Sequence, residues 1–193
     1  MTSTASLLLS LAFAATGTST AVLAKTFQGV PSVDNKTGPV ATVANSAATS
    51  GTDTAFANGT MFVGSVEVPS TFLATGVQYL VGSVGGTDKV IAVLYDSAGN
   101  PLANSTTAAS GTTAGTAAQI QQLAFTSPIN VAGPGRYYVG IAANGATAKI
   151  RTVPAFTQSG SLGGTISWTH GTIAQITAAS TFTADQVPFA AIY

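Results

Sequence analysis

The sequence has 193 residues and no cysteine, and its six basic and six acidic residues give a formal net charge of zero. These features exclude disulfides, thiolate metal sites and a cysteine nucleophile, and they leave no basic patch for nucleic acid. Only 6% of the residues are charged, whereas a typical domain carries about 25%. The polar surface must therefore consist of uncharged residues, which repel neighbouring subunits little and tolerate close packing against them.

The chain begins MTSTASLLLSLAFAATGTSTAVLAK, with a short apolar run at residues 5–15. A signal peptide normally carries a basic residue before such a run, but the first basic residue here is Lys25. A membrane-spanning helix needs about 20 consecutive apolar residues, and this run is too short. We therefore expect this segment to belong to the mature protein, with removal of a leader near Ala24 as the alternative.

Residues 1–58 are rich in Ser, Thr, Ala and Gly and show no helical periodicity, which predicts an extended N-terminal arm. Short strands are expected within it at Ala21–Phe27 and Val40–Val43. Extended chain buries its apolar side chains by adding strands to the edges of a partner. The residues that we expect to bind a partner in this way are Leu7, Leu8, Leu9, Leu11 and Phe13.

From residue 59 onward, short apolar or alternating runs are separated by Gly, Pro, Asn and Asp. KVIAVLY, at Lys89–Tyr95, is apolar on both faces, which predicts a central strand that is covered on both sides. DSAGNP follows it and predicts the turn of a β-hairpin that ends near Ser105. A cation held by Asp96 and Asn100 is a weaker alternative for this turn, because the further acidic ligands of a calcium loop are missing.

Further strands are predicted by AQIQQLAF, RYYVGIAA and TAKIRTV, with SPINVAGPG as a connection. Asn144-Gly145 predicts a hairpin between the second and third of these runs. A Gly-rich loop, a short strand TISW and a terminal strand VPFAAIY complete the chain. About eight short strands without a helix predict an all-β fold, a jelly-roll-like β-sandwich over residues 59–193 that follows the arm at 1–58.

Two stretches between Gly59 and Arg151 carry a family pattern: GTMFVGSVEVPSTFLATGVQYLVGSVGGTDKVIAVLYDSAGNPLANS and LAFTSPINVAGPGRYYVGIAANG. Their succession of strands and turns resembles β-sandwich modules in structural proteins of tailed bacteriophages. It is also similar to carbohydrate-binding and pre-peptidase-type sandwiches, which share the strand–D-x-x-G–strand hairpin and the G-x-Y-Y-V strand. The first resemblance implies a virion component, such as a capsid decoration (cement) protein or a tail or fibre subunit. The predicted arm and the low charge favour a non-enzymatic decoration protein that binds and stabilises the major capsid lattice.

The same resemblance implies a location on the particle surface, after assembly in the host cytoplasm. Its expected partners are the major capsid protein or other virion subunits, together with further copies of the chain, a trimer being one option. No nucleic acid, membrane or cofactor is expected. The alternatives are a tail or fibre module that binds a carbohydrate or receptor, and a secreted surface adhesin.

The chain carries no recognisable catalytic motif or metal site. His170 is the only histidine, no G-x-S-x-G is present, and no acidic residue lies near His170 in the sequence, which favours a loop histidine beside Trp168. We therefore expect no catalytic residue and no metal ligand. Trp168 and Tyr138 are predicted to form an exposed aromatic contact, either for a sugar or for another subunit, whereas Tyr137 is predicted to lie in the core.

Overall fold

The computed structural model describes residues 41–42, 51–106, 111–153, 163–177 and 186–193. These residues form thirteen strands, all paired antiparallel, and contain no helix. The described part of the chain is therefore all-β, as predicted. The described strands outnumber the eight expected because several of them are only two to four residues long.

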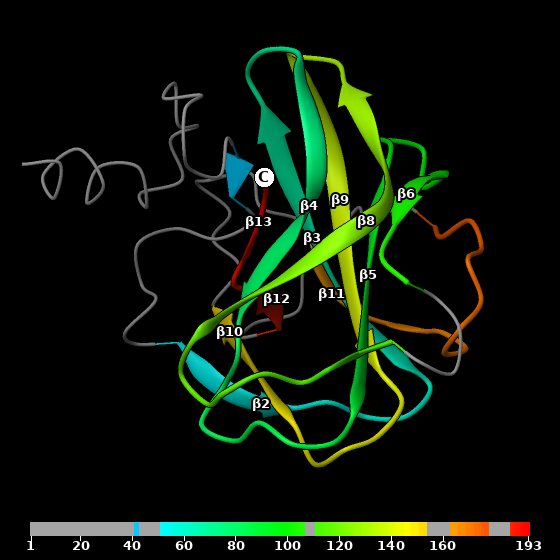
Figure 1. The fold of residues 1–193 in the computed structure, drawn as a ribbon. Helices are drawn as coiled ribbons and strands as arrows, with labels where there is room; N and C mark the ends of the chain where they lie inside the picture. Colours follow the sequence, from blue (N-terminus) through cyan, green and yellow to red (C-terminus); the bar gives the residue numbers. More distant parts are fainter. Residues whose placement is uncertain (1–40, 43–50, 107–110, 154–162, 178–185) are drawn as a thin grey trace, which may run out of the picture.

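The strands belong to three sheets (Figure 1). The largest has the order β11-β3-β9-β5-β6, with β7 pairing β5; its strands are β11 (Gly163–Ser167), β3 (Thr60–Val68), β9 (Gly135–Ala143), β5 (Lys89–Tyr95), β6 (Pro101–Asn104) and β7 (Thr112–Thr113). A four-stranded sheet consists of β1 (Ala41–Thr42), β13 (Ala190–Ile192), β4 (Phe72–Leu80) and β8 (Ile120–Val131). A small sheet consists of β12 (Val187–Pro188), β10 (Lys149–Val153) and β2 (Thr52–Ala55).

The six-stranded and four-stranded sheets enclose one apolar core. Figure 1 shows β8 crossing in front of β9 and β5. Alternate side chains of each strand point inward, because the side-chain period of a strand is two. Val66 on β3, Val77 on β4 and Ile141 on β9 are among these buried residues. The two main sheets contribute to one core, so the arrangement is sandwich-like. Single antiparallel bridges link the sheets at their margins: Ser105 with Phe125 joins the two main sheets, and Val81 with Ile150 joins the four-stranded sheet to the small sheet.

The central strand β5 is buried on both faces, which confirms the prediction from KVIAVLY. Its side chains at Val90, Ala92 and Leu94 lie in the core between the sheets. Those at Ile91, Val93 and Tyr95 lie in a second apolar cluster on the outer face of the six-stranded sheet. This second cluster exists because a later segment, residues 168–177, covers that face.

The hairpin predicted at the DSAGNP turn is also confirmed. β5 pairs with β6, and the Asp96 carboxylate accepts hydrogen bonds from the backbone N–H groups of Ala98 and Asn100, both at 2.8 Å. Gly99 has a φ of 83°, a conformation that a residue with a side chain adopts at a cost. Asp96 therefore organises the turn through backbone N–H groups, as an Asx turn does.

The hairpin predicted at Asn144-Gly145 is wrong, because β9 and β10 lie in different sheets. The Asn144 side chain instead accepts a hydrogen bond from the backbone N–H of Lys89. The buried Asp88 carboxylate accepts the N–H groups of Thr147 and Ala148, both at 2.7 Å. These contacts direct the chain away from β9. The hydrogen bonds of Asn144 and Asp88 to residues distant in the sequence therefore prevent the hairpin that Asn144-Gly145 alone would favour.

The prediction of SPINVAGPG as a connection is wrong in part, because β8 continues through its first five residues. Pro128 is tolerated there because β8 lies at the edge of its sheet and its register against β4 shifts between Ala124 and Ile129, so Pro128 has no partner in the β4 ladder. This proline therefore marks an irregularity in an edge strand, not the end of the strand.

The predicted boundary between arm and domain at residue 58 is wrong. β2 pairs with β10, and Phe56 is 1% exposed within the central core, where its ring contacts that of Phe62 edge-on. These residues are therefore an integral part of the sheet structure. The strand predicted at Val40–Val43 is present as β1, which pairs with β13.

Other parts of the predicted arm lie outside the described residues. These include the strand expected at Ala21–Phe27 and the partner-binding residues Leu7, Leu8, Leu9, Leu11 and Phe13.

Candidate functional site

The outer faces of the two main sheets are the surfaces on which a partner or ligand can be considered. The part of the outer face of the four-stranded sheet that β4 and β8 form, here called the open face, comprises side chains that pair across these two strands. Its members are Leu73 with Asn130, Gln78 with Gln122, and Leu80 with Ile120, together with Ala124. Leu73 is 58% exposed and Ile120 is 48% exposed, so the two ends of this face are apolar and open to solvent.

The open face carries no charge, since neither FLATGVQYL in β4 nor IQQLAFTSPINV in β8 contains a charged residue. Between its apolar ends lie amides, and Gln122 donates a hydrogen bond to the Gln78 side chain across the strands at 3.5 Å. A surface of amides and aliphatic side chains loses little solvation when it is covered, because no ion has to be desolvated.

Charged side chains of the described residues form contacts elsewhere. Arg136 pairs with Glu67 at 2.5 Å, and Arg151 pairs with Asp53 at 3.1 Å. A hydrogen bond from the Ser83 hydroxyl lowers the pKa of Asp53, and the positive charge of Arg151 lowers it further. These contacts hold the charges beside other strands and leave the open face neutral.

The outer face of the six-stranded sheet, by contrast, is covered by residues 168–177. The backbone N–H of Trp168 donates to the Gly59 carbonyl at 2.8 Å, and that of Ile176 donates to the Gly99 carbonyl at 2.9 Å. Between these anchors the His170 ring donates from Nε2 to the Lys89 carbonyl and lies edge-on to the Trp168 indole. This confirms the prediction of a loop histidine beside Trp168.

The covering segment closes an apolar cluster over the sheet. Its buried members are Met61, Val63, Ile91, Val93, Tyr95, Tyr138, Ala142, Trp168 and Ile176. The Tyr95 hydroxyl lies 3.5 Å from the Met61 sulfur, and burial raises the pKa of Tyr95 to about 12. Tyr95 is therefore a neutral core residue whose hydroxyl keeps its proton and donates it in a hydrogen bond to the Met61 sulfur.

The expected exposed aromatic contact is wrong, because Trp168 is 7% exposed and Tyr138 is 3% exposed. The alternation along β9 correctly places Tyr138 opposite the central core, on the outer face of its sheet. That face is covered, however, so the opposite side of the strand is a second interior and not solvent. Tyr137 is half-buried against the central core, as predicted.

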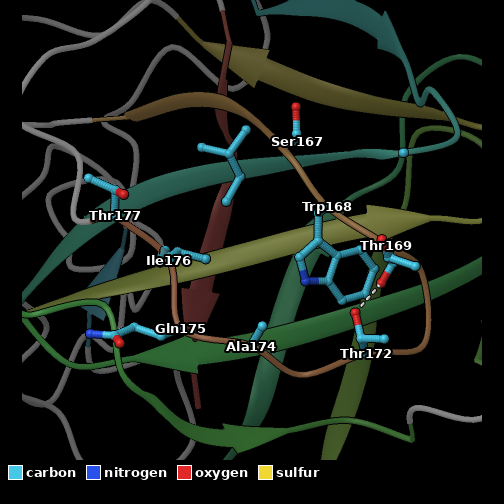
Figure 2. A pocket seen from close by; sticks show the side chains of 10 residues that line it. Ser167, Trp168, Thr169, Thr172, Ala174, Gln175, Ile176 and Thr177 are labelled. Carbon is cyan, nitrogen blue, oxygen red and sulfur yellow. Dashed lines mark hydrogen bonds between the residues drawn. The ribbon is translucent and has the colours of Figure 1, made fainter.

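Beside the covering segment lies a cavity of about 580 Å³. It is lined by Gly59, Ile166, Ser167, Trp168, Thr169, Thr172, Ala174, Gln175, Ile176 and Thr177 (Figure 2). The Trp168 indole nitrogen is buried and has no hydrogen-bond partner among the described residues. The sequence points to Trp168 but not to the cavity, since the cavity walls come from a polar segment that shows no strand pattern.

No cluster of three or more His, Asp or Glu side chains suited to a metal ion occurs among the described residues. Within the same part of the chain, no helix is long and apolar enough to cross a membrane.

Comparison of the chain with protein-family models, with curated proteins and with solved structures finds no match.

Proposed function

We propose that this protein is a non-enzymatic structural protein of a virion, a capsid decoration protein that binds the major capsid lattice at the particle surface. The observation that carries the proposal is the open face, an uncharged sheet surface with apolar residues at both ends. Packed structural proteins bury surfaces whose desolvation costs little free energy, and an uncharged face of amides and aliphatic side chains supports such a role.

The proposed contact combines two kinds of interaction. Leu73 and Ile120, at opposite ends of the face, bury aliphatic surface against the partner, at about 25 cal/mol per Å² of area removed from water. Gln78, Gln122 and Asn130 supply hydrogen bonds that orient the partner. The proposed N-terminal arm adds strands to a neighbouring subunit through its leucines and Phe13.

A jelly-roll connectivity is part of the proposal. In jelly rolls, strands that are distant in the sequence pair within two facing sheets. The pairing of β3 with β9, and of β4 with β8 in the facing sheet, supports this connectivity. An oligomer on the capsid, such as a trimer, also belongs to the proposal, because a surface with little charge tolerates contact with further copies of itself.

The test places charges on the open face. We expect the double variant Leu73→Lys, Ile120→Lys to fold normally and to lose binding to native shells by at least about 100-fold, since each buried unpaired charge is strongly unfavourable. The matched control is Leu102→Lys, at a residue that is 37% exposed on β6 of the other sheet. Co-sedimentation of the purified variants with shells measures binding, and equal binding by the double variant would sink the proposed contact.

Deletion of residues 1–25 tests the arm. The truncated protein is expected to keep its β-sheet circular dichroism and its cooperative unfolding but to lose binding to shells. Equal binding by the truncated protein would remove the arm from the proposal.

Cryo-electron microscopy of the native particle then separates the alternatives. Density on the capsid lattice supports a decoration protein, whereas density on a tail or fibre favours a receptor-binding or carbohydrate-binding module. Native protein that begins near Lys25 by intact mass and resides on a cell surface favours a secreted adhesin.

A further inference from the structure

The cavity beside Trp168 has the size and lining of a small-molecule site. Its volume of about 580 Å³ lies within the range of about 300–1,000 Å³ that is usual for such sites. Ile166, Ala174 and Ile176 supply apolar walls, while the hydroxyl and amide groups come from Ser167, Thr169, Thr172, Gln175 and Thr177. None of the ten described residues that line the cavity is charged.

The Trp168 indole N–H is the group that points to a ligand. Only 7% of the residue is exposed, and Nε1 is buried without a partner among the described residues. Buried polar groups in proteins are hydrogen-bonded in at least about 90% of cases, and an unmet donor costs about 1–3 kcal/mol. Figure 2 shows the nitrogen turned toward the space that the covering segment encloses, on the side of Ile176. Because an indole N–H only donates, the missing group is an acceptor.

The hydrogen bonds of the covering segment favour a ligand rich in hydroxyl groups over an extended peptide. The backbone N–H groups of Trp168, Thr172 and Ile176 already donate to carbonyls within the protein. An extended peptide would need such groups in order to pair with the segment as a strand does. The side-chain hydroxyls retain acceptor capacity, since the Thr172 hydroxyl donates to the Thr169 carbonyl at 2.7 Å and keeps its lone pairs. The lining therefore suits a ligand that presents several hydroxyl groups.

The uncharged side chains of the described lining favour a neutral ligand over an ionic one. An anion or a cation would find no counter-charge among the ten described lining residues and would lose its hydration. We propose that this cavity binds a neutral saccharide unit, with one of its oxygens accepting a hydrogen bond from Trp168 Nε1 and its C–H groups against Ile166 and Ile176. In this proposal the sugar contacts the edge of the Trp168 indole. It does not stack on the indole face, because the indole is packed within the apolar cluster.

Trp168 is the only tryptophan, so its fluorescence reports directly on the site. The full-length protein is titrated with maltose, cellobiose, lactose and N,N′-diacetylchitobiose at up to millimolar concentrations. A saturable change in the emission of Trp168 with at least one of these sugars is expected.

Two variants test the contacts. Trp168→Phe keeps an aromatic ring in the cluster and removes the N–H; by isothermal calorimetry we expect at least about 10-fold weaker binding, the effect of one lost buried hydrogen bond. Gln175→Ala, at an exposed lining residue, keeps the fluorophore and is expected to weaken binding several-fold. The control variant Leu73→Lys, on the open face, is expected to bind sugar as the wild type does, and thermal melts verify that all three variants are folded.

Two results would overturn the proposal. One is the absence of a saturable response to every sugar, including the case in which a capped neutral peptide alone saturates the signal. The other is unchanged affinity in both Trp168→Phe and Gln175→Ala. The site shares no residue with the open face, so its failure and that of the capsid-binding proposal are distinguishable.

Discussion

The two outer faces of this protein differ although they flank the same core. The face of the six-stranded sheet carries Met61, Val63 and Ile91 and is sealed by residues 168–177. The open face carries amides and isolated aliphatic residues, with the Tyr193 ring beside Gly76, and its ends at Leu73 and Ile120 are exposed to solvent. The comparison shows that the residues of a sheet face decide whether another segment must cover it. A continuous apolar face requires a covering segment, because its exposure to water is unfavourable. A mixed uncharged face is stable in water and remains available to a partner.

The largest expected effect contrasts two isoleucines, one on each face. Ile91 is fully buried under the covering segment, whereas Ile120 is 48% exposed. Ile91→Ala is expected to lower the free energy of unfolding by about 2–5 kcal/mol, because it removes buried methylene groups and leaves a cavity. Ile120→Ala is expected to change it by less than about 0.5 kcal/mol. Urea denaturation measures both, and equal losses would show that the two faces are not distinguished as described.

The attachment of the covering segment can be tested at two glycines that share a φ of 83°, Gly99 and Gly59. Alanine at either position must adopt a left-handed conformation, at a cost of about 1–2 kcal/mol. At Gly99 the added Cβ would also collide with the carbonyl oxygen of Ile176, whereas at Gly59 its nearest neighbour is 4.0 Å away.

Gly99→Ala is therefore expected to destabilise the protein more than Gly59→Ala and to shift the emission of Trp168 to longer wavelength as the segment loosens. Chemical denaturation and the emission spectrum of the native state are the measurements. Identical losses of stability and unshifted spectra would contradict an anchoring role for the Gly99–Ile176 contact.

Acid should act on the small sheet through Asp53. The pKa of its carboxyl group lies below the ordinary value of 3.8 in the folded protein, because of the Ser83 hydrogen bond and the charge of Arg151. The ionised carboxylate therefore adds stability at pH values above 3.8, and this contribution is lost as the pH falls through the lower folded value. Asp53→Asn should reduce the fall in melting temperature below pH 3.8, and an unchanged pH profile would refute the role of this carboxylate.

The smallest effect is expected from the ion pair between Glu67 and Arg136, on neighbouring strands of the six-stranded sheet. Both side chains are largely exposed, and such pairs contribute about 0–1 kcal/mol. Glu67→Gln should therefore change the midpoint of denaturation only slightly, and less still in high salt. A loss that exceeds about 1 kcal/mol would mean that this pair supports the covered face more strongly than its exposure implies.

Much of the strand structure could be predicted because it depends on neighbours in the sequence. The doubly apolar run at β5 and the Asp96 turn each carry their physical cause within a few residues. The candidate site could not be predicted in the same way. The local pattern puts Trp168 and Tyr138 on the surface, and only the return of residues 168–177 over β9 and β5 makes that side of the sheet an interior.

The sequence by itself determined an all-β protein with few charges, because side-chain periodicity, turn residues and composition act locally or in aggregate. Only the tertiary structure decided which outer face is covered, that Phe56 belongs to the core, and that Asn144-Gly145 leads into another sheet. Each of these depends on contacts between residues far apart in the chain, such as the bonds of Asp88 to Thr147 and Ala148. A local pattern specifies a strand and its two sides, but the packing of distant segments decides which sides meet water.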